Sequence, residues 1–147
     1  MPSEDALAIH IIDLSTAKSW YAAKAEWSLD RIYMNNDTQN CPCGHVIKEV
    51  CVIRNRTNGN ETEVGNVCVY KFMAIDSRSL FDSFRRVSSG ASKTFSEDMI
   101  AYARRHNLIS NWDVTFYLDI RTRRRLTERQ LAQKNRINDQ ILTFVVK

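Results

Sequence analysis

Three of the four cysteines of this 147-residue chain lie within eleven positions, in the stretch NCPCGHVIKEVC at 40–51. The fourth, Cys68, follows in VGNVCVYKF. The chain does not open with a basic segment followed by an apolar stretch, which argues against a secretory signal and predicts a cytoplasmic protein with reduced thiols. Clustered cysteines in a reducing compartment favour a metal site over disulfide bonds. This cluster therefore constrains the fold of the N-terminal half more than any other feature.

Zinc is the metal that the pattern predicts, because Zn²⁺ takes four thiolate or imidazole ligands in a tetrahedron. Cys41 and Cys43 flank Pro42 and precede Gly44, an arrangement typical of a metal-binding knuckle. Their C-x-C spacing is shorter than the usual C-x₂-C, so the local geometry has to adjust. Cys68 is the third expected ligand, because a helix predicted to start there offers N–H groups and a positive dipole end to a thiolate.

Two residues compete for the fourth ligand position. His45 and Cys51 lie on the same face of a predicted strand, and a fully extended strand separates them by roughly 20 Å at about 3.3 Å per residue. We therefore do not expect both to bind one ion. The predicted ligand set is Cys41, Cys43, Cys51 and Cys68, with His45 as the alternative fourth ligand.

The cysteines are also compatible with other roles. Cys51 and Cys68 are compatible with small core residues, but that interpretation leaves the proline and glycine of the knuckle unexplained. A redox pair lacks the surrounding βαβ pattern of thioredoxin-like proteins. An iron–sulfur cluster also uses four cysteines, but the predicted hairpin and the candidate histidine ligand favour zinc.

The sequence favours a closed structural site over a catalytic one, and no catalytic residue is predicted. Catalytic zinc keeps an open position beside a general base, whereas the chain contains no H-E-x-x-H, H-x-E…P-C-x-x-C, Walker or G-x-S-x-G motif. A ββα-metal nuclease site with His45 and Asn55 or Asn60 is a weaker alternative, because His45 adjoins the knuckle itself. We expect a protein that is not an enzyme and has no small-molecule substrate.

The residue pattern predicts an α+β fold. The first part is predicted to contain a strand or apolar arm at 6–13, a helix at 15–34, a turn at 35–40, and a hairpin of strands at 45–54 and 62–65. A helix carrying Cys68 follows, so that knuckle, hairpin and helix form a treble-clef-like layout. The remaining elements are predicted helices at 77–87, 96–109, 110–123 and 126–146.

Two regions are predicted, which we expect to pack as one compact domain. Residues 1–75 form the helix and zinc-binding module, with a formal charge of −2, and residues 76–147 form a helical region with a formal charge of +6. No run of apolar residues is long enough to span a membrane. The basic region therefore predicts an anionic partner, although a solvated helical surface would show the same composition.

Arginine forks suit phosphate oxygens, so nucleic acid, either DNA or RNA, is the predicted partner. The candidate contact residues are Arg104, Arg105, Arg121, Arg123, Arg124, Arg125 and Arg129. Three aromatic residues of the same region, Tyr102, Trp112 and Tyr117, are candidates for base stacking. On amphipathic helices, however, such residues are more often part of the core.

The segments AEWSL, CPCGHVI, IRNRTNGN and VGNVCVYKF together resemble a group of uncharacterised small proteins of phages and prophages. These proteins share a C-x-C-G…N-G-N…V-G-N-x-C pattern, and the resemblance covers about residues 20–72. It implies a treble-clef-like zinc module and a phage origin, with the host cytoplasm as the location. The predicted function is nucleic-acid binding by a zinc protein. The alternative is a phage-encoded factor that binds a host protein complex and inhibits or redirects it.

Overall fold

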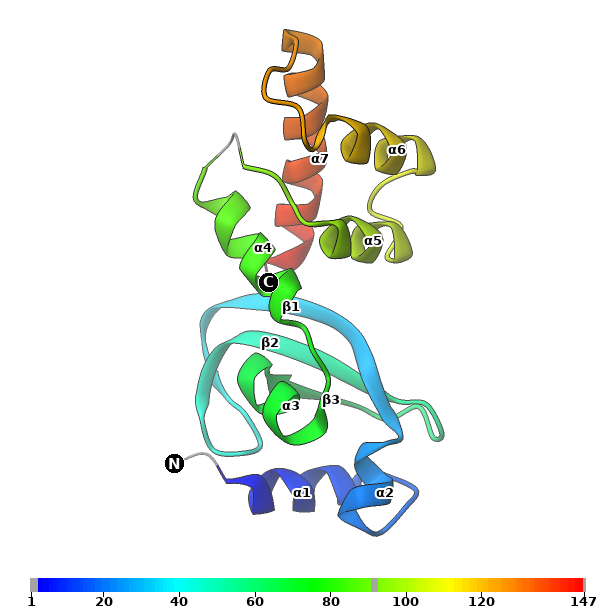
Figure 1. Ribbon diagram of the computed structural model, residues 1–147. Helices are drawn as coiled ribbons and strands as arrows, with labels where there is room; N and C mark the ends of the chain where they lie inside the picture. Colours follow the sequence, from blue (N-terminus) through cyan, green and yellow to red (C-terminus); the bar gives the residue numbers. More distant parts are fainter. Residues whose placement is uncertain (1–2, 91–92, 147) are drawn as a thin grey trace. The chain divides into compact units, whose positions relative to one another are not determined.

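In the computed structural model, residues 3–90 and 93–146 are described, and they form an α+β fold with a three-stranded antiparallel sheet and helices before and after it (Figure 1). The chain divides into two units, the first ending at Ser77 and the second spanning Arg78–Val146. None of the described helices is both long and apolar enough to cross a membrane.

The first element is the helix α1, Glu4–Asp13, where the sequence predicted a strand or apolar arm over 6–13. The Ser3 hydroxyl caps this helix by accepting a hydrogen bond of 3.2 Å from a first-turn backbone N–H, and two acidic residues in that turn suit the positive end of the dipole. Leu7 and Ile11, four residues apart, are fully buried. The strand prediction is wrong because nearly every residue of this stretch is apolar, so that the helical spacing of the two buried residues cannot be recognised in the sequence.

The predicted helix over 15–34 is wrong for most of its length. Only α2, Trp20–Lys24, is helical there, and β1 runs through Trp27–Asn40. Pairing with β2, which places Tyr33 opposite Val50, supplies backbone hydrogen bonds and buries aromatic and β-branched side chains. Tertiary pairing of this kind overrides a helix-like spacing of apolar residues.

The segment 35–40, predicted as a turn, also belongs to β1. The register of β1 against β2 shifts between Met34 and Gln39, so the turn-forming residues sit in an irregular stretch of the strand. Polar side chains tie this stretch together: Asn35 donates to Gln39 Oε1 over 2.8 Å. The turn formers therefore mark a strand irregularity here, and the chain does not reverse direction at this point.

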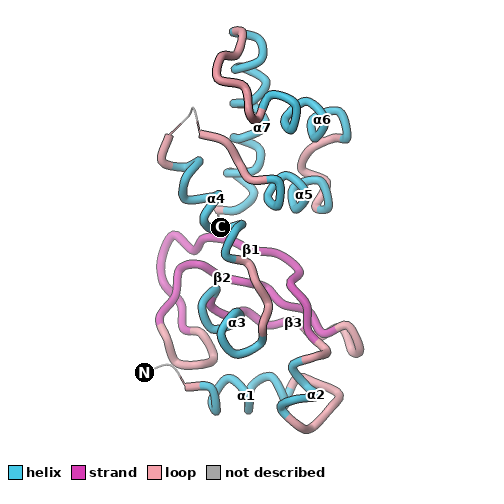
Figure 2. Tube along the Cα trace, in the orientation of Figure 1, coloured by secondary structure: helices cyan, strands magenta, loops and turns pink. Residues whose placement is uncertain are grey.

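The two predicted hairpin strands are confirmed. β2, Val46–Asn55, is the central strand of the order β1-β2-β3, and β3 is Glu61–Gly65 (Figure 2). The turn between them contains Gly59 at a φ of 79°, as the Asn-Gly dipeptide predicts. β3 leads directly into α3, Asn66–Met73, which contacts β2 and β3. This sequence of elements positions Cys68.

The second unit consists of four helices in its described part, which are α4 at Arg78–Ser88, α5 at Glu97–Arg105, α6 at Asn111–Ile120 and α7 at Glu128–Val145. The predicted N-caps Ser96, Ser110 and Thr127 are confirmed by their hydrogen bonds to first-turn N–H groups. The polar loop predicted at 88–94 lies partly outside the described residues, because 91 and 92 are not among them.

A buried tyrosine organises the core of the second unit. The Tyr117 side chain is fully buried, its hydroxyl donates to Asn138 Oδ1 over 2.7 Å, and it accepts from the Phe95 N–H over 2.9 Å. Burial raises the pKa of Tyr117 to about 12. The phenol therefore stays neutral at physiological pH and links α6, α7 and the segment before α5.

Candidate metal centre

The knuckle that carries Cys41 and Cys43 is the connection between β1 and β2, at 41–45. The Gly44 N–H donates to the Cys41 carbonyl oxygen, and the Cys41 N–H donates to the His45 carbonyl oxygen, both over 2.8 Å. Gly44 has a φ of 94°, in the left-handed region that a side chain disfavours. These bonds close a tight turn, and the side chains of Cys41 and Cys43 are both buried.

Cys68 comes from the first turn of α3. Gly65 is the N-cap of this helix, and a Cβ atom at that position would lie 2.8 Å from Ile47 Cγ2, so the close packing of α3 on β2 requires glycine. The Gly65 N–H points at Cys41 Sγ over 3.4 Å. The start of α3 therefore supplies one ligand candidate and one hydrogen-bond donor to another.

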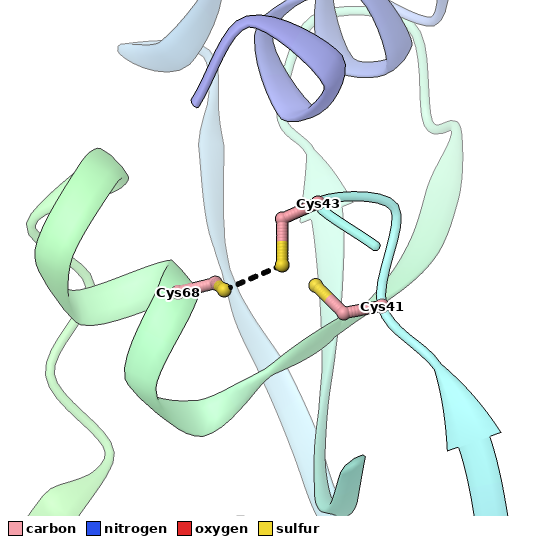
Figure 3. A group of neighbouring side chains, drawn as sticks. All are labelled: Cys41, Cys43 and Cys68. Atoms are coloured by element: carbon pink, nitrogen blue, oxygen red, sulfur yellow. Dashed lines mark hydrogen bonds between the residues drawn. The ribbon is translucent and has the colours of Figure 1, made fainter. Parts of the chain in front are cut away.

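The three sulfur atoms converge. The Sγ atoms of Cys41, Cys43 and Cys68 all lie within 4.8 Å of one another, and the three residues are buried. Figure 3 shows their side chains pointing toward one another, two from the knuckle and one from α3. Cys43 Sγ and Cys68 Sγ are 2.8 Å apart, longer than the bond of about 2.05 Å in a disulfide, and all four cysteines are free thiols.

The thiols of this group differ in their tendency to ionise. Burial raises the pKa of Cys41 and of Cys68, because a buried thiolate loses its hydration. Burial acts in the same direction on Cys43, but hydrogen bonds from the Cys68 thiol and the His45 backbone N–H outweigh it and lower the Cys43 pKa. A divalent cation would favour the ionised form of all three.

Cys51, the preferred fourth ligand from the sequence, lies elsewhere. Its Sγ is 3.0 Å from Ser77 Oγ, and Ser77 in turn donates to Asn66 Oδ1, so the Cys51 thiol is the donor. Burial raises its pKa to about 11. The alternative ligand, His45, is exposed. Within residues 3–90 and 93–146, the group of converging ligand atoms contains neither of them.

One support of the site was missed by the sequence reasoning. The Ser3 N–H donates to the Cys43 carbonyl oxygen over 2.9 Å, which ties the cap of α1 to the knuckle. The signal was available, because Ser3 followed by two acidic residues is a helix start, but nothing local connects it to a cysteine forty positions away.

The predicted nucleic-acid-binding arginines lie on the second unit, and several serve internal contacts. Arg104 donates to Asn111 Oδ1 over 2.6 Å, and the Arg105 guanidinium lies 5.6 Å from the centre of the Tyr102 ring. These two side chains therefore stabilise the end of α5 and its connection to α6.

Two arginines after α6 form ion pairs. Arg121 is 3.6 Å from Glu97, and Arg123 is 2.9 Å from Asp119. Arg124, by contrast, is exposed and has no hydrogen-bond or ion-pair partner in the described part of the chain, and the same holds for Arg125 and Arg129. These last three are the arginines that the fold leaves available.

The aromatic candidates for base stacking separate into two groups. Tyr102 and Tyr117 are core residues, at 2% and 0% exposure. Trp112 is 59% exposed and stacks on Phe116, with ring centroids 5.2 Å apart and nearly parallel planes. Only Trp112 has a ring face accessible to a base.

Comparison of the chain with protein-family models, with curated proteins and with solved structures finds no match. The resemblance to phage proteins and the phage origin therefore stay predictions.

Proposed function

We propose that the first unit binds one Zn²⁺ ion through Cys41, Cys43 and Cys68, and that the second unit binds nucleic acid through arginine contacts to phosphates. The convergence of three thiols, two of them 25 positions apart in sequence, carries the first part of this proposal. Sulfurs bound at about 2.3 Å around tetrahedral zinc are about 3.8 Å apart. The three sulfurs lie within 4.8 Å of one another, and the Cys43–Cys68 pair, at 2.8 Å, would separate by about 1 Å on binding the ion.

The role that we assign to the metal is structural. It would join the knuckle to α3 and would supply the positive charge that three buried thiolates need. The Gly65 N–H already points at one sulfur, as the second shell of zinc sites commonly does. Zinc would thereby tie the connection between β1 and β2 to the helix that packs on β2 and β3.

Metal content of purified variants tests this role. Native mass spectrometry of the protein purified without chelator should show one zinc per chain in the wild type and none in Cys68→Ser or Cys43→Ser. Cys51→Ser is the matched control, because it removes a buried thiol of the same unit that lies outside the cluster. Stoichiometric zinc in Cys68→Ser, or loss of zinc in Cys51→Ser, would contradict the assigned ligand set.

The second part of the proposal rests on Arg124, Arg125 and Arg129. They are exposed and flank the start of α7, where the positive end of the helix dipole favours acidic side chains over basic ones. These arginines therefore contribute nothing evident to the stability of the helix. The phosphates of a nucleic acid would accept hydrogen bonds from these arginines, and their negative charge would also be favourable at the positive end of the helix dipole. The exposed ring of Trp112 adds a surface on which a base can stack.

Salt dependence of binding tests the arginine contacts. Replacing Arg124, Arg125 and Arg129 by alanine should weaken binding to a fluorescent duplex and reduce the log–log salt slope by about 2.7, at about 0.9 per phosphate contact. The matched control replaces Lys24, Arg31 and Arg54 of the first unit, an equal change in charge. Equal salt slopes for the two triple variants would mean that only the net charge of the protein affects binding. That result would contradict a specific arginine surface.

The alternative function is binding of a host protein complex. Its candidate contacts are three apolar side chains of the first unit that are at least 70% exposed, namely Ile9, Tyr21 and Val67. A purified partner that binds the wild type, and that loses binding when Val67 and Tyr21 are changed to aspartate but not when the three arginines are removed, would support this alternative over nucleic-acid binding.

A further inference from the structure

We infer that the metal centre has an exchangeable fourth position, which a small thiol bearing a carboxylate fills from a pocket beside Cys68. The inference rests on the proposed zinc site and deepens it by naming a ligand class. It departs from the sequence-based expectation that no small molecule is bound. Three observations carry it: the number of protein ligands, the position of the pocket and the chemistry of the pocket wall.

The first observation is the number of protein ligands. Zinc takes four ligands in a structural site, but no fourth histidine, cysteine or carboxylate atom joins the three sulfurs within the described ranges. The five residues outside those ranges are Met, Pro, Ala, Ser and Lys, so they add no such side chain. Cys51 is occupied by its bond to Ser77, in a buried position. The centre is therefore a three-thiol site with one position left for a ligand from outside.

The second observation is a pocket of about 310 Å³ that has Cys68 in its wall. It lies between the start of β2 and α3, and its lining includes His45, Ile47, Gly65 and Phe72. This volume is at the lower end of the range for small-ligand sites, which begins near 300 Å³. A small molecule in this pocket would lie next to a metal held by the Cys68 sulfur.

The third observation is the chemistry of the pocket wall. Ile47 and Phe72 offer apolar surface to a short hydrocarbon stem. Lys48 and Lys71 also line the pocket, and the Lys71 ammonium lies 5.3 Å from the centre of the Phe72 ring, which places a positive charge at the wall. The acidic residue of the wall, Glu49, accepts a hydrogen bond of 3.3 Å from Asn66. A ligand with a carboxylate is complementary to this arrangement.

A second pocket touches the cluster on another side, but its chemistry is different. It has Cys41 in its wall together with Gln39, Thr62 and Glu63. Each of the two pockets has one glutamate in its wall, but the lining of this one contains no lysine or arginine to offset the negative charge. The pocket beside Cys68 is therefore the one that suits an anion.

Binding is a ligand exchange. The thiol would release its proton to solvent, and its sulfur would donate an electron pair to the metal as the water in the fourth position leaves. Neither partner would change oxidation state. A thiolate matches the three ligands already present, and zinc binds soft sulfur donors well. The carboxylate at the other end of the ligand stays in the pocket beside the two lysines.

Cobalt substitution makes this exchange visible, because Co²⁺ in a thiolate site absorbs in the visible range and its spectrum reports the ligand set. The full-length Co²⁺ protein is titrated with 3-mercaptopropionate, with 2-mercaptoethanol and with propionate. We expect both thiols, but not propionate, to change the spectrum saturably. Changing Lys48 and Lys71 to alanine should lower the affinity for 3-mercaptopropionate about five-fold and leave the affinity for 2-mercaptoethanol unchanged.

The matched control changes Lys24 and Arg31, two half-buried cations outside this pocket, to alanine and should change the affinity for neither thiol. Dialysis after the titration should leave one cobalt per chain, which excludes extraction of the metal by the thiol. A spectrum that no thiol alters would overturn the inference. So would a spectrum of the thiol-free protein that changes in His45→Ala, because His45 would then hold the fourth position. If the protein shows no cobalt–thiolate absorption at all, the proposed metal centre is wrong, and the inference about its fourth ligand is wrong with it.

Discussion

Two glycines control how closely the three thiols approach one another. Gly44 has a φ of 94° and allows the knuckle to turn within five residues. Gly65 lets α3 pack on β2, where any side chain would meet Ile47. Each glycine acts on a different segment, so the position of Cys68 relative to Cys41 depends on both. The geometry of the site is therefore set by residues that carry no ligand atom.

Replacing Gly65 by alanine tests this dependence. The added Cβ would lie 2.8 Å from Ile47 Cγ2, so the helix or the isoleucine has to move. We expect a loss of about 1–3 kcal/mol in the free energy of unfolding and a weaker affinity for zinc, measured by denaturant titration and by competition with a chelating dye. The matched control is Gly90→Ala, where the nearest atom is a Lys93 side-chain carbon at 3.4 Å. Equal losses for the two variants would contradict this account.

Residue types alone predicted part of the site. Cys41, Cys43 and Cys68 were expected as ligands, because knuckle spacing and a helix start are local signals. The location of Cys51 was not predictable, since its partner Ser77 is 26 positions away and a serine carries no pairing signal. His45 was a candidate on proximity in sequence, but the turn of the knuckle leaves its side chain exposed.

At the level of elements, the helices of the second half were predicted well and the first forty residues poorly. Capping residues are local signals, so Ser96, Ser110 and Thr127 marked three helix starts correctly. β1 has no comparable signal. Its helix-like spacing of apolar residues becomes a strand only through pairing with β2, which the sequence places after the knuckle.

The contact between α6 and α7 yields a prediction on pH dependence. Burial acts to raise the pKa of Asp113, but the Ser110 backbone N–H and the Arg136 guanidinium, which is 2.6 Å from the carboxylate, outweigh it and lower the pKa. A lowered pKa in the folded state stabilises the protein above the ordinary pKa of the group, and this contribution is lost as the pH falls through the lowered value.

Asp113→Asn should therefore cost about 1–2 kcal/mol of unfolding free energy at neutral pH, and the cost should shrink as the pH falls below about 4. Denaturant titrations followed by circular dichroism at several pH values measure this. The matched control is Asp119→Asn, since the exposed Asp119–Arg123 pair is worth roughly 0.3–0.5 kcal/mol. A cost for Asp113→Asn that does not change with pH would contradict the role of the carboxylate charge.

At the level of the whole molecule, the chain divides into two compact units, and each contains buried residues of its own. All three converging thiols belong to the first unit, which ends at Ser77, whereas the second unit is organised around Tyr117 and the residues that it contacts. The formal charges of the two halves also differ in sign. We accordingly assign metal binding to the first unit and phosphate binding to the second.

Removal of the metal should therefore destabilise the first unit and leave the stability of the second unit unchanged. A ligand present at about 1,000 times its dissociation constant contributes about 4 kcal/mol of stability, and this contribution disappears on chelation. We expect hydrogen exchange, followed by mass spectrometry, to accelerate in β2, β3 and α3 and to stay unchanged in α7. Equal acceleration in both units, or none in the first, would contradict a metal site that stabilises the first unit.

The three-thiol centre itself is tested most directly by zinc K-edge X-ray absorption on protein purified without added thiol. This account predicts three sulfur ligands at about 2.3 Å and one nitrogen or oxygen ligand at about 2.0–2.1 Å. The Cys51→Ser variant should give the same spectrum, because Cys51 bonds to Ser77 outside the cluster. A fourth sulfur ligand that is lost in Cys51→Ser, or fewer than three sulfur ligands in the wild type, would contradict the centre formed by Cys41, Cys43 and Cys68.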